Sequence, residues 1–200
     1  ELFGQENPYL GIYAHTDGIH LRMIGRGLDQ SAAEKVIGPV EAEIRRLIGD
    51  SIWGTDEDTP AGRAASILID RNQTLAVVEG ASAGALASML HALPERESFF
   101  RGALVPGSGP VHAGHDTASI DENGAVTLAH LARESLSADV GISVTPVDMT
   151  DGIVYIGMVS NSGTHVAKGR FPRHNPEWLM QRSATTAIVQ LMDALSSDRI

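Results

Sequence analysis

The stretch Thr74-Leu75-Ala76-Val77-Val78-Glu79-Gly80-Ala81-Ser82-Ala83-Gly84 decides the fold of the larger part of this chain. It opens with a continuous apolar run, which is typical of a strand covered on both faces. Small residues follow, and we expect a helix over residues 83–91. A buried strand, a tight turn and a helix in this order indicate an α/β domain with a largely parallel or mixed sheet.

The same alternation continues toward the C-terminus. Apolar runs predict further strands, and amphipathic stretches predict helices between them. We expect strands at 103–105, 140–144, 153–159 and 165–171, and helices at 61–71, 126–135 and 176–195. Strands that alternate with helices predict an α/β class fold, a three-layer α/β/α sandwich, over residues 57–200.

Residues 1–56 have a different pattern and predict a small α+β module before that domain. Two short strands are expected within 9–27, around a turn at Thr16-Asp17-Gly18. Asp29 can cap a helix that Gly49 ends, with a kink or division at Gly38-Pro39. Ile52-Trp53 is expected to form a third strand. The polar, acidic segment from Gly54 to Pro60 reads as a linker.

Composition narrows the classes of partner. The 200 residues include no cysteine and have a formal net charge of −10. Absent cysteines exclude a disulfide scaffold and thiolate chemistry, and they favour a cytoplasmic protein. The negative charge repels phosphate, so we expect neither nucleic acid nor a membrane as a partner, although a local basic patch can still bind one anion. The chain begins at Glu1 rather than Met, so we expect it to be part of a longer protein.

Several blocks, in this order and spacing, resemble the CinA (competence/damage-inducible protein A) family over about 125 residues. They are Thr74–Glu79 with its turn, Phe99–Gly102, Gly124–Val126, Ala138–Thr145, Gly152–Ile156 and Arg170–Pro172. The resemblance implies the C-terminal amidohydrolase-type domain of that family. The first module, with Ile19–Arg22 and Ile52–Asp56, is similar to the KH-like linking domain of long members, which a nucleotide-hydrolase domain precedes.

The resemblance implies deamidation of nicotinamide mononucleotide, but the positions that would catalyse it are substituted. The family nucleophile is a serine directly after the glutamate of a Glu-Ser-Cys-Thr-Gly-Gly turn, and the matching position here is Gly80. The family's tyrosine falls on Pro106 and its lysine near Val111. The substrate loop reads Thr145-Pro146-Val147-Asp148-Met149-Thr150 and is shorter. Because covalent catalysis needs a hydroxyl and a base, we expect no catalytic residues and an inactive or impaired site.

The same positions can still hold a ligand. We expect a nucleotide to contact residues of the turn and two residues later in the chain. These are Glu79, Gly80, Ser82, Gly84, Thr145 and Arg182. Backbone N–H groups at the start of a helix can bind an anion, although Glu79 would oppose one. The alternative is a tight turn that needs small residues for packing.

Two alternative hypotheses would make the chain an active amidohydrolase. One relocates the nucleophile to Ser82 or Ser108. The other lets His112, His115 and Asp116 hold zinc or nickel, which activates water. Since no base or third ligand is evident, we expect no metal and no cofactor. The first module also lacks the Gly-x-x-Gly loop with which KH domains clamp nucleic acid. We therefore expect nucleotide binding or a dimerisation and scaffolding role, in a homo-oligomer.

Overall fold

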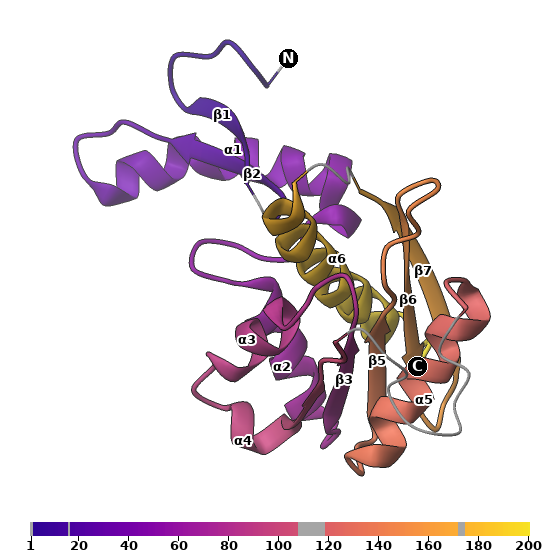
Figure 1. Ribbon diagram of the computed structural model, residues 1–200. Helices are drawn as coiled ribbons and strands as arrows, with labels where there is room; N and C mark the ends of the chain where they lie inside the picture. The colour runs from indigo at the N-terminus through magenta and orange to yellow at the C-terminus, as the bar shows by residue number, and fades with distance from the viewer. Residues whose placement is uncertain (1, 16, 108–118, 172–174) are drawn as a thin grey trace. The chain divides into compact units, whose positions relative to one another are not determined.

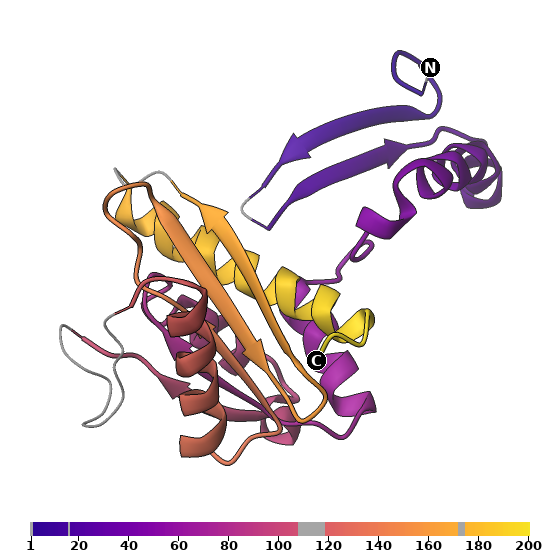
Figure 2. The same cartoon turned by 90° about the vertical axis from the view of Figure 1, so that its right-hand side faces the viewer.

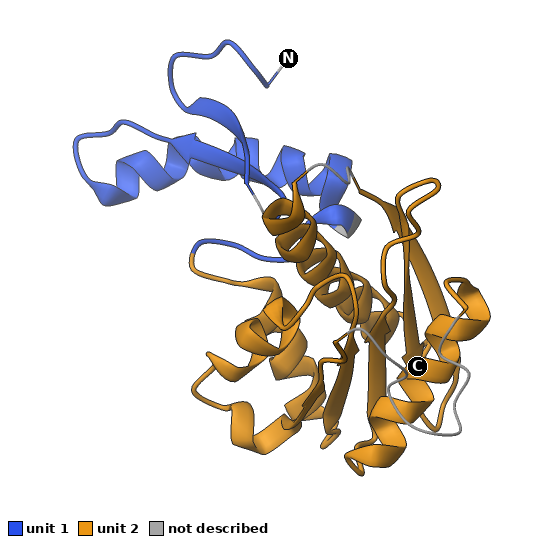
Figure 3. Ribbon diagram, viewed as in Figure 1, with its two compact units in different colours: residues 1–56 blue, residues 57–200 orange. Residues whose placement is uncertain are grey.

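A computed structural model describes residues 2–15, 17–107, 119–171 and 175–200, with the side chain of Asp50 left out. The chain consists of two compact units, Glu1–Asp56 and Glu57–Ile200 (Figure 3). Unit 1 contains a two-stranded sheet and one long helix, whereas unit 2 contains a five-stranded sheet with helices on both faces. The expected α/β class and its small α+β module are confirmed.

Unit 1 is built on a hairpin and a helix. Strands β1 (Tyr9–Ala14) and β2 (Ile19–Ile24) pair antiparallel, and α1 (Gln30–Ile48) packs on one face of them. As expected, Asp29 caps α1 by accepting a hydrogen bond from the N–H of Ala32 at 2.8 Å. The core of this unit is apolar and small: Leu10, Val40 and Ile44 are buried, and Leu2, Leu21, Met23 and Ile52 pack against them.

Two details of unit 1 differ from the prediction. Pro39 neither divides nor ends α1, because it lies on the exposed side, where the carbonyl it leaves unbonded can face water. Ile52 and Trp53 form no strand. The N–H of Ile52 instead bonds the carbonyl of Gly49 at 3.0 Å and closes the short helix η1 (Gly49–Ser51), while the Ile52 side chain joins the core.

Unit 2 has a mixed sheet in the order β4-β3-β5-β6-β7 (Figure 1). The strands are β3 (Leu75–Glu79), β4 (Phe100–Leu104), β5 (Val140–Val144), β6 (Ile153–Val159) and β7 (Thr164–Arg170). Strand β3 is parallel to β4 and β5, and β6 is antiparallel to β5 and β7. All residues of β3 and β5 are buried, as their apolar runs indicate.

Helices cover both faces of this sheet. Helix α5 (Glu122–Ser135) packs on one face, and α6 (Pro176–Ser196) packs on the other together with α2 (Pro60–Asp70) and α3 (Ala85–His91) (Figure 2). A short helix, α4 (Arg96–Phe99), leads into β4. Gly141 allows α5 to approach β5 closely, since a Cβ atom there would lie 2.0 Å from the carbonyl oxygen of Ala129.

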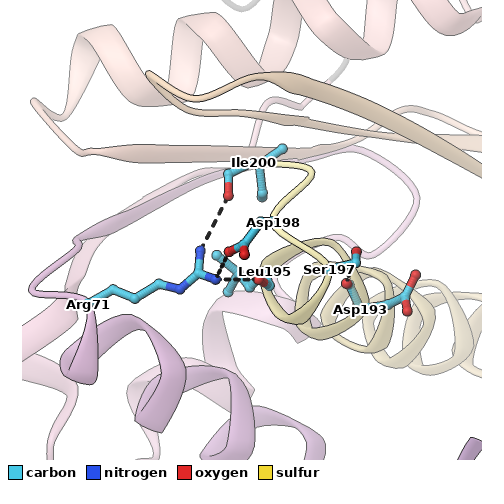
Figure 4. Close-up of polar contacts among 6 residues, drawn as sticks. All are labelled: Arg71, Asp193, Leu195, Ser197, Asp198 and Ile200. Carbon is cyan, nitrogen blue, oxygen red and sulfur yellow. Dashed lines mark hydrogen bonds and ion pairs between the residues drawn. The ribbon is translucent and has the colours of Figure 1, made fainter. Parts of the chain in front are cut away.

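Arg71 fastens the end of α6 to the end of α2. Its guanidinium donates hydrogen bonds to the carbonyl of Leu195 at 2.5 Å and to that of Ile200 at 3.4 Å, and it pairs with the carboxylate of Asp198 (Figure 4). The planar fork of arginine suits several acceptors at once, which the single ammonium of lysine does not match.

We expect Arg71→Met to lower the free energy of unfolding by about 1.5 kcal/mol, since charge-assisted bonds to carbonyls of the α6 end are lost. Arg199→Met is the control. Arg199 makes an exposed ion pair with Asp193, so its loss should cost less than about 0.5 kcal/mol. Urea denaturation measures both values. If both variants lose the same free energy of unfolding, the bonds from Arg71 do not stabilise the end of α6.

Thr74 and Asp139 join the starts of β3 and β5. The carboxylate of Asp139 accepts from the hydroxyl of Thr74 at 2.7 Å and from its N–H at 2.9 Å, and the Thr74 hydroxyl accepts from the N–H of Asp139 at 3.0 Å. The hydrogen bonds from the side chain and backbone of Thr74 lower the pKa of Asp139 below its ordinary value, helped by the charges of Arg101 and Arg133 and opposed by burial.

The hydrogen bonds between Thr74 and Asp139 make the free energy of unfolding depend on pH under acidic conditions. Because the folded pKa is lowered, the stabilisation is fully present above the unfolded value of about 3.9 and is lost as the pH falls through the folded pKa. We expect Asp139→Asn to cost about 1 kcal/mol at pH 7 and progressively less as the pH falls through the folded pKa. Urea midpoints between pH 7 and 2 measure this, with exposed Glu57→Gln as the control. A difference that stays constant across the range would contradict the assignment.

None of the helices in the described ranges is long and apolar enough to cross a membrane.

Candidate functional site

The turn after β3 lies at the carboxyl ends of two parallel strands, where open α/β sheets commonly bind ligands. The pairing of β3 with β5 continues into it: the N–H of Gly80 donates to Val144 at 2.7 Å, and that of Ala81 donates to Thr145 at 3.0 Å. The turn residues are therefore tied directly to the segment that follows β5.

Gly80 faces backbone where a side chain would project. A Cβ atom at this position would lie 2.4 Å from the nitrogen of Pro146, 2.7 Å from the carbonyl carbon of Thr145 and 2.9 Å from Cδ of Pro146. Real Cβ atoms essentially never approach so closely, and backbone cannot swing aside as a side-chain tip can. The position that matches the family nucleophile is thus closed by residues 145–146.

Glu79 is fully buried and bonded to the start of α3. Its carboxylate accepts hydrogen bonds from the N–H groups of Gly84 at 2.9 Å, Leu86 at 3.1 Å and Ala87 at 2.7 Å. These are the donors that a helix start offers to an anion. These N–H groups are therefore already bonded to an acceptor from the protein's own chain.

Ser82 is the hydroxyl next to this corner. Its side chain is fully buried, and within the described ranges its Oγ has no hydrogen-bond partner. Among the described residues no base is bonded to this enclosed hydroxyl, so it lacks the access and the activation that a nucleophile needs. The following Ala83 and Gly84 have positive φ angles of 47° and 95°, so the chain turns sharply into α3.

Thr145 is also enclosed. Its N–H donates to the carbonyl of Tyr155 at 2.9 Å, and its Oγ1 accepts from the N–H of Tyr155 at 2.9 Å. Its carbonyl accepts from Ala81. Thr145 therefore fastens β5 to β6 and to the turn, and it presents no exposed surface for a ligand.

Arg182 lies on α6 with an aromatic neighbour that sequence reasoning missed. Its guanidinium carbon is 5.6 Å from the centroid of the Trp178 ring. That ring forms a T-shaped pair with Phe171, with 6.5 Å between the two centroids. Trp178 is 37% exposed. The spacing of four residues on a helix is the signal that could have found this pair, since such residues share a face.

The remaining candidates fall outside this description. Ser108, Val111, His112, His115 and Asp116 belong to residues 108–118, which lie outside the described residues. Pro106 is half-buried after β4 and offers no hydroxyl. Across the residues that the structure places, no group of three or more histidine, cysteine, aspartate or glutamate side chains is arranged to hold a metal ion.

Comparison with protein families assigns both units. Residues 1–54 match the family described as the damage-inducible protein CinA KH domain, and residues 57–195 match the CinA C-terminal domain. A CinA-like protein of Thermosynechococcus vestitus is 32% identical over 203 residues, covering 92% of this chain and 49% of that protein. A CinA-like protein of Gloeobacter violaceus is 30% identical, covering 91% and 47%. The chain spans about half the length of these relatives.

Solved structures agree with this assignment at the level of the fold. A CinA superfamily protein from Klebsiella pneumoniae superposes with a TM-score of 0.62 at 18% identity, covering 69% of this chain and 96% of that one. One from Escherichia coli gives 0.60 at 20% identity, covering 70% and 93%. Both match the α/β/α architecture described above. The resemblance expected from the ordered sequence blocks is confirmed: this chain belongs to the CinA family and joins a CinA KH domain to a CinA C-terminal domain.

Proposed function

We propose that this chain is a non-catalytic member of the CinA family that serves as a dimerisation and scaffolding unit. One observation supports this most strongly: the backbone of Thr145 and Pro146 closes the space in which a side chain at position 80 would project. Resemblance to the family implies hydrolysis of the carboxamide of nicotinamide mononucleotide. Here the position of the attacking oxygen has neither an oxygen nor room for one.

The neighbouring groups do not replace that chemistry. Attack on a carboxamide needs a hydroxyl that a base can deprotonate. Ser82 is enclosed, and the carboxylate of Glu79 already accepts three backbone hydrogen bonds. Using Glu79 as a base would break the cap of α3. The closed corner and the three backbone hydrogen bonds to Glu79 therefore support a structural role. The absence of cysteine supports a cytoplasmic location.

A second candidate function is nucleotide binding without turnover, which the pair Trp178 and Arg182 supports. A partly exposed indole can stack on a pyridine or purine ring, and the neighbouring guanidinium can bind a phosphate. Titration calorimetry with nicotinamide mononucleotide tests this reading. Micromolar binding that Trp178→Ala and Arg182→Ala abolish would establish a nucleotide site. If no heat of binding is measured, scaffolding remains as the proposed role.

Ammonia release from nicotinamide mononucleotide tests the loss of catalysis. The expected result is release no faster than in a blank without protein, while a working nicotinamide-nucleotide amidohydrolase in the same buffer gives a linear signal. Ser82→Ala is the paired variant, and it should match the unaltered chain. Turnover by the unaltered chain that Ser82→Ala abolishes would establish the relocated serine and overturn the proposal. Turnover that chelation abolishes would instead point to a metal-bound water.

A further inference from the structure

The loop between β5 and β6 carries an exposed thioether. All six methionines of the chain lie within the described residues. Met149 is 67% exposed, whereas Met158 is fully buried and Met192 is 7% exposed. The other three, Met23, Met89 and Met180, are half-buried. Met149 is therefore the methionine whose side chain a dissolved reagent reaches most readily while the protein stays folded.

Hydrogen bonds fix this loop without the side chain of Met149. The N–H of Asp148 donates to the carbonyl of Ile153, and the N–H of Gly152 donates to the carbonyl of Asp148, each at 2.8 Å. The carboxylate of Asp148 accepts from the N–H of Thr150 at 2.7 Å. A chemical change at the sulfur of Met149 therefore removes none of the donors or acceptors that hold the loop.

We propose that Met149 is a site of reversible oxidation to methionine sulfoxide, with hydrogen peroxide as the oxidant. The sulfur attacks one peroxide oxygen, so an S–O bond forms as the O–O bond breaks. The departing hydroxide takes the proton of the transferred oxygen and leaves as water. Sulfur loses two electrons and the peroxide gains them, which places the product on the first step of methionine oxidation.

The reverse reaction requires a partner enzyme. Reduction of the sulfoxide takes two electrons from a pair of thiols, which become a disulfide while the oxygen leaves as water. The chain has no cysteine to supply these thiols. A methionine sulfoxide reductase must therefore act on the side chain of Met149 from outside, and an exposed loop gives it access.

The position of Met149 makes its oxidation compatible with the fold. A sulfoxide is polar, so its formation at a buried methionine such as Met158 in β6 would disrupt the packing. At Met149 water can hydrate the new oxygen. Hydrogen peroxide is neutral, so neither Asp148 nor the net charge of −10 repels it, as both would repel anionic hypochlorite. This modification does not depend on the scaffolding role.

Graded treatment of the whole chain with hydrogen peroxide, followed by peptide mapping with mass spectrometry, tests the site. We expect the first added oxygen at Met149, with a rate at least about tenfold above that of any other methionine. Met149→Leu should remove this first oxidation, whereas Met180→Leu, at a half-buried position, should retain it. If Met180 or another half-buried methionine is oxidised as fast as Met149, the assignment is wrong.

Reversibility is tested on the folded, singly oxidised chain. It is incubated with dithiothreitol and the two methionine sulfoxide reductases, one for each sulfoxide epimer. We expect Met149 to return to its unmodified mass, and we expect the singly oxidised chain to keep the urea midpoint of the unmodified chain. A sulfoxide that the reductases reduce only after urea has unfolded the chain would overturn the proposal. A urea midpoint lowered by this single oxidation would overturn it as well.

Discussion

Replacing Gly80 by serine is expected to lower the free energy of unfolding by about 3 kcal/mol and to restore no amidohydrolase activity. The new Cβ would have to displace the backbone of residues 145–146, two atoms of which it would approach to 2.4 and 2.7 Å. That displacement would strain the hydrogen bonds that join Gly80 to Val144 and Ala81 to Thr145. The substitution would supply the family's hydroxyl, but only in a distorted corner. Urea denaturation and ammonia release measure the two effects.

Gly49→Ala is the control for this experiment. Gly49 has the αR conformation at the end of α1, and a Cβ there would meet no atom within 4 Å beyond its chain neighbours. Alanine there should change the stability by less than about 1 kcal/mol. If Gly80→Ser is as stable as the unaltered chain, the corner has room for a side chain. The steric account of the missing nucleophile would then be wrong.

Replacing Glu79 by alanine is expected to cost about 4 kcal/mol, because three backbone N–H groups at the start of α3 lose their acceptor inside the protein. Glu79→Gln keeps the size of the side chain but turns an NH₂ group toward N–H donors, so we expect a loss of about 2 kcal/mol. Urea denaturation at pH 7 measures both. Glu97→Ala, at a mostly exposed carboxylate, should change the stability by less than about 0.5 kcal/mol.

The result for Glu79 separates two roles. A residue kept for catalysis or for a ligand often costs stability, so its removal is neutral or stabilising. A residue kept as an internal cap is needed for the fold. If Glu79→Ala leaves the stability unchanged, the carboxylate of Glu79 is not an internal cap, and the ligand-binding role that the sequence predicts for it would be favoured.

Much of the fold follows from local patterns. The apolar runs of β3 and β5 predict buried strands, and Asp29 marks the start of α1 as the structure has it. Short elements are harder to predict. Helix α4 has only four residues, too few for a helical period, and the prediction for β4 began three residues late because Arg101 and Gly102 interrupt its apolar run.

The candidate site shows what a sequence leaves out. The missing hydroxyl at Gly80 can be seen by counting from Glu79, but its closure depends on Thr145 and Pro146, about 65 residues away in the chain. Glu79 was expected to oppose a bound anion. In the structure its carboxylate accepts hydrogen bonds from the start of α3, which the turn through Ala83 and Gly84 brings next to it. Hydrogen bonds that depend on tertiary position leave no periodic signal in the sequence.

Mass spectrometry of nicotinamide mononucleotide incubated with a molar excess of this protein tests the absence of catalysis most directly. Excess protein allows even one slow turnover per molecule to be detected. We expect the amount of nicotinate mononucleotide to stay at that of a protein-free blank after prolonged incubation. Product above the blank, formed in proportion to the protein and lost in Ser82→Ala, would contradict an inert corner at Gly80.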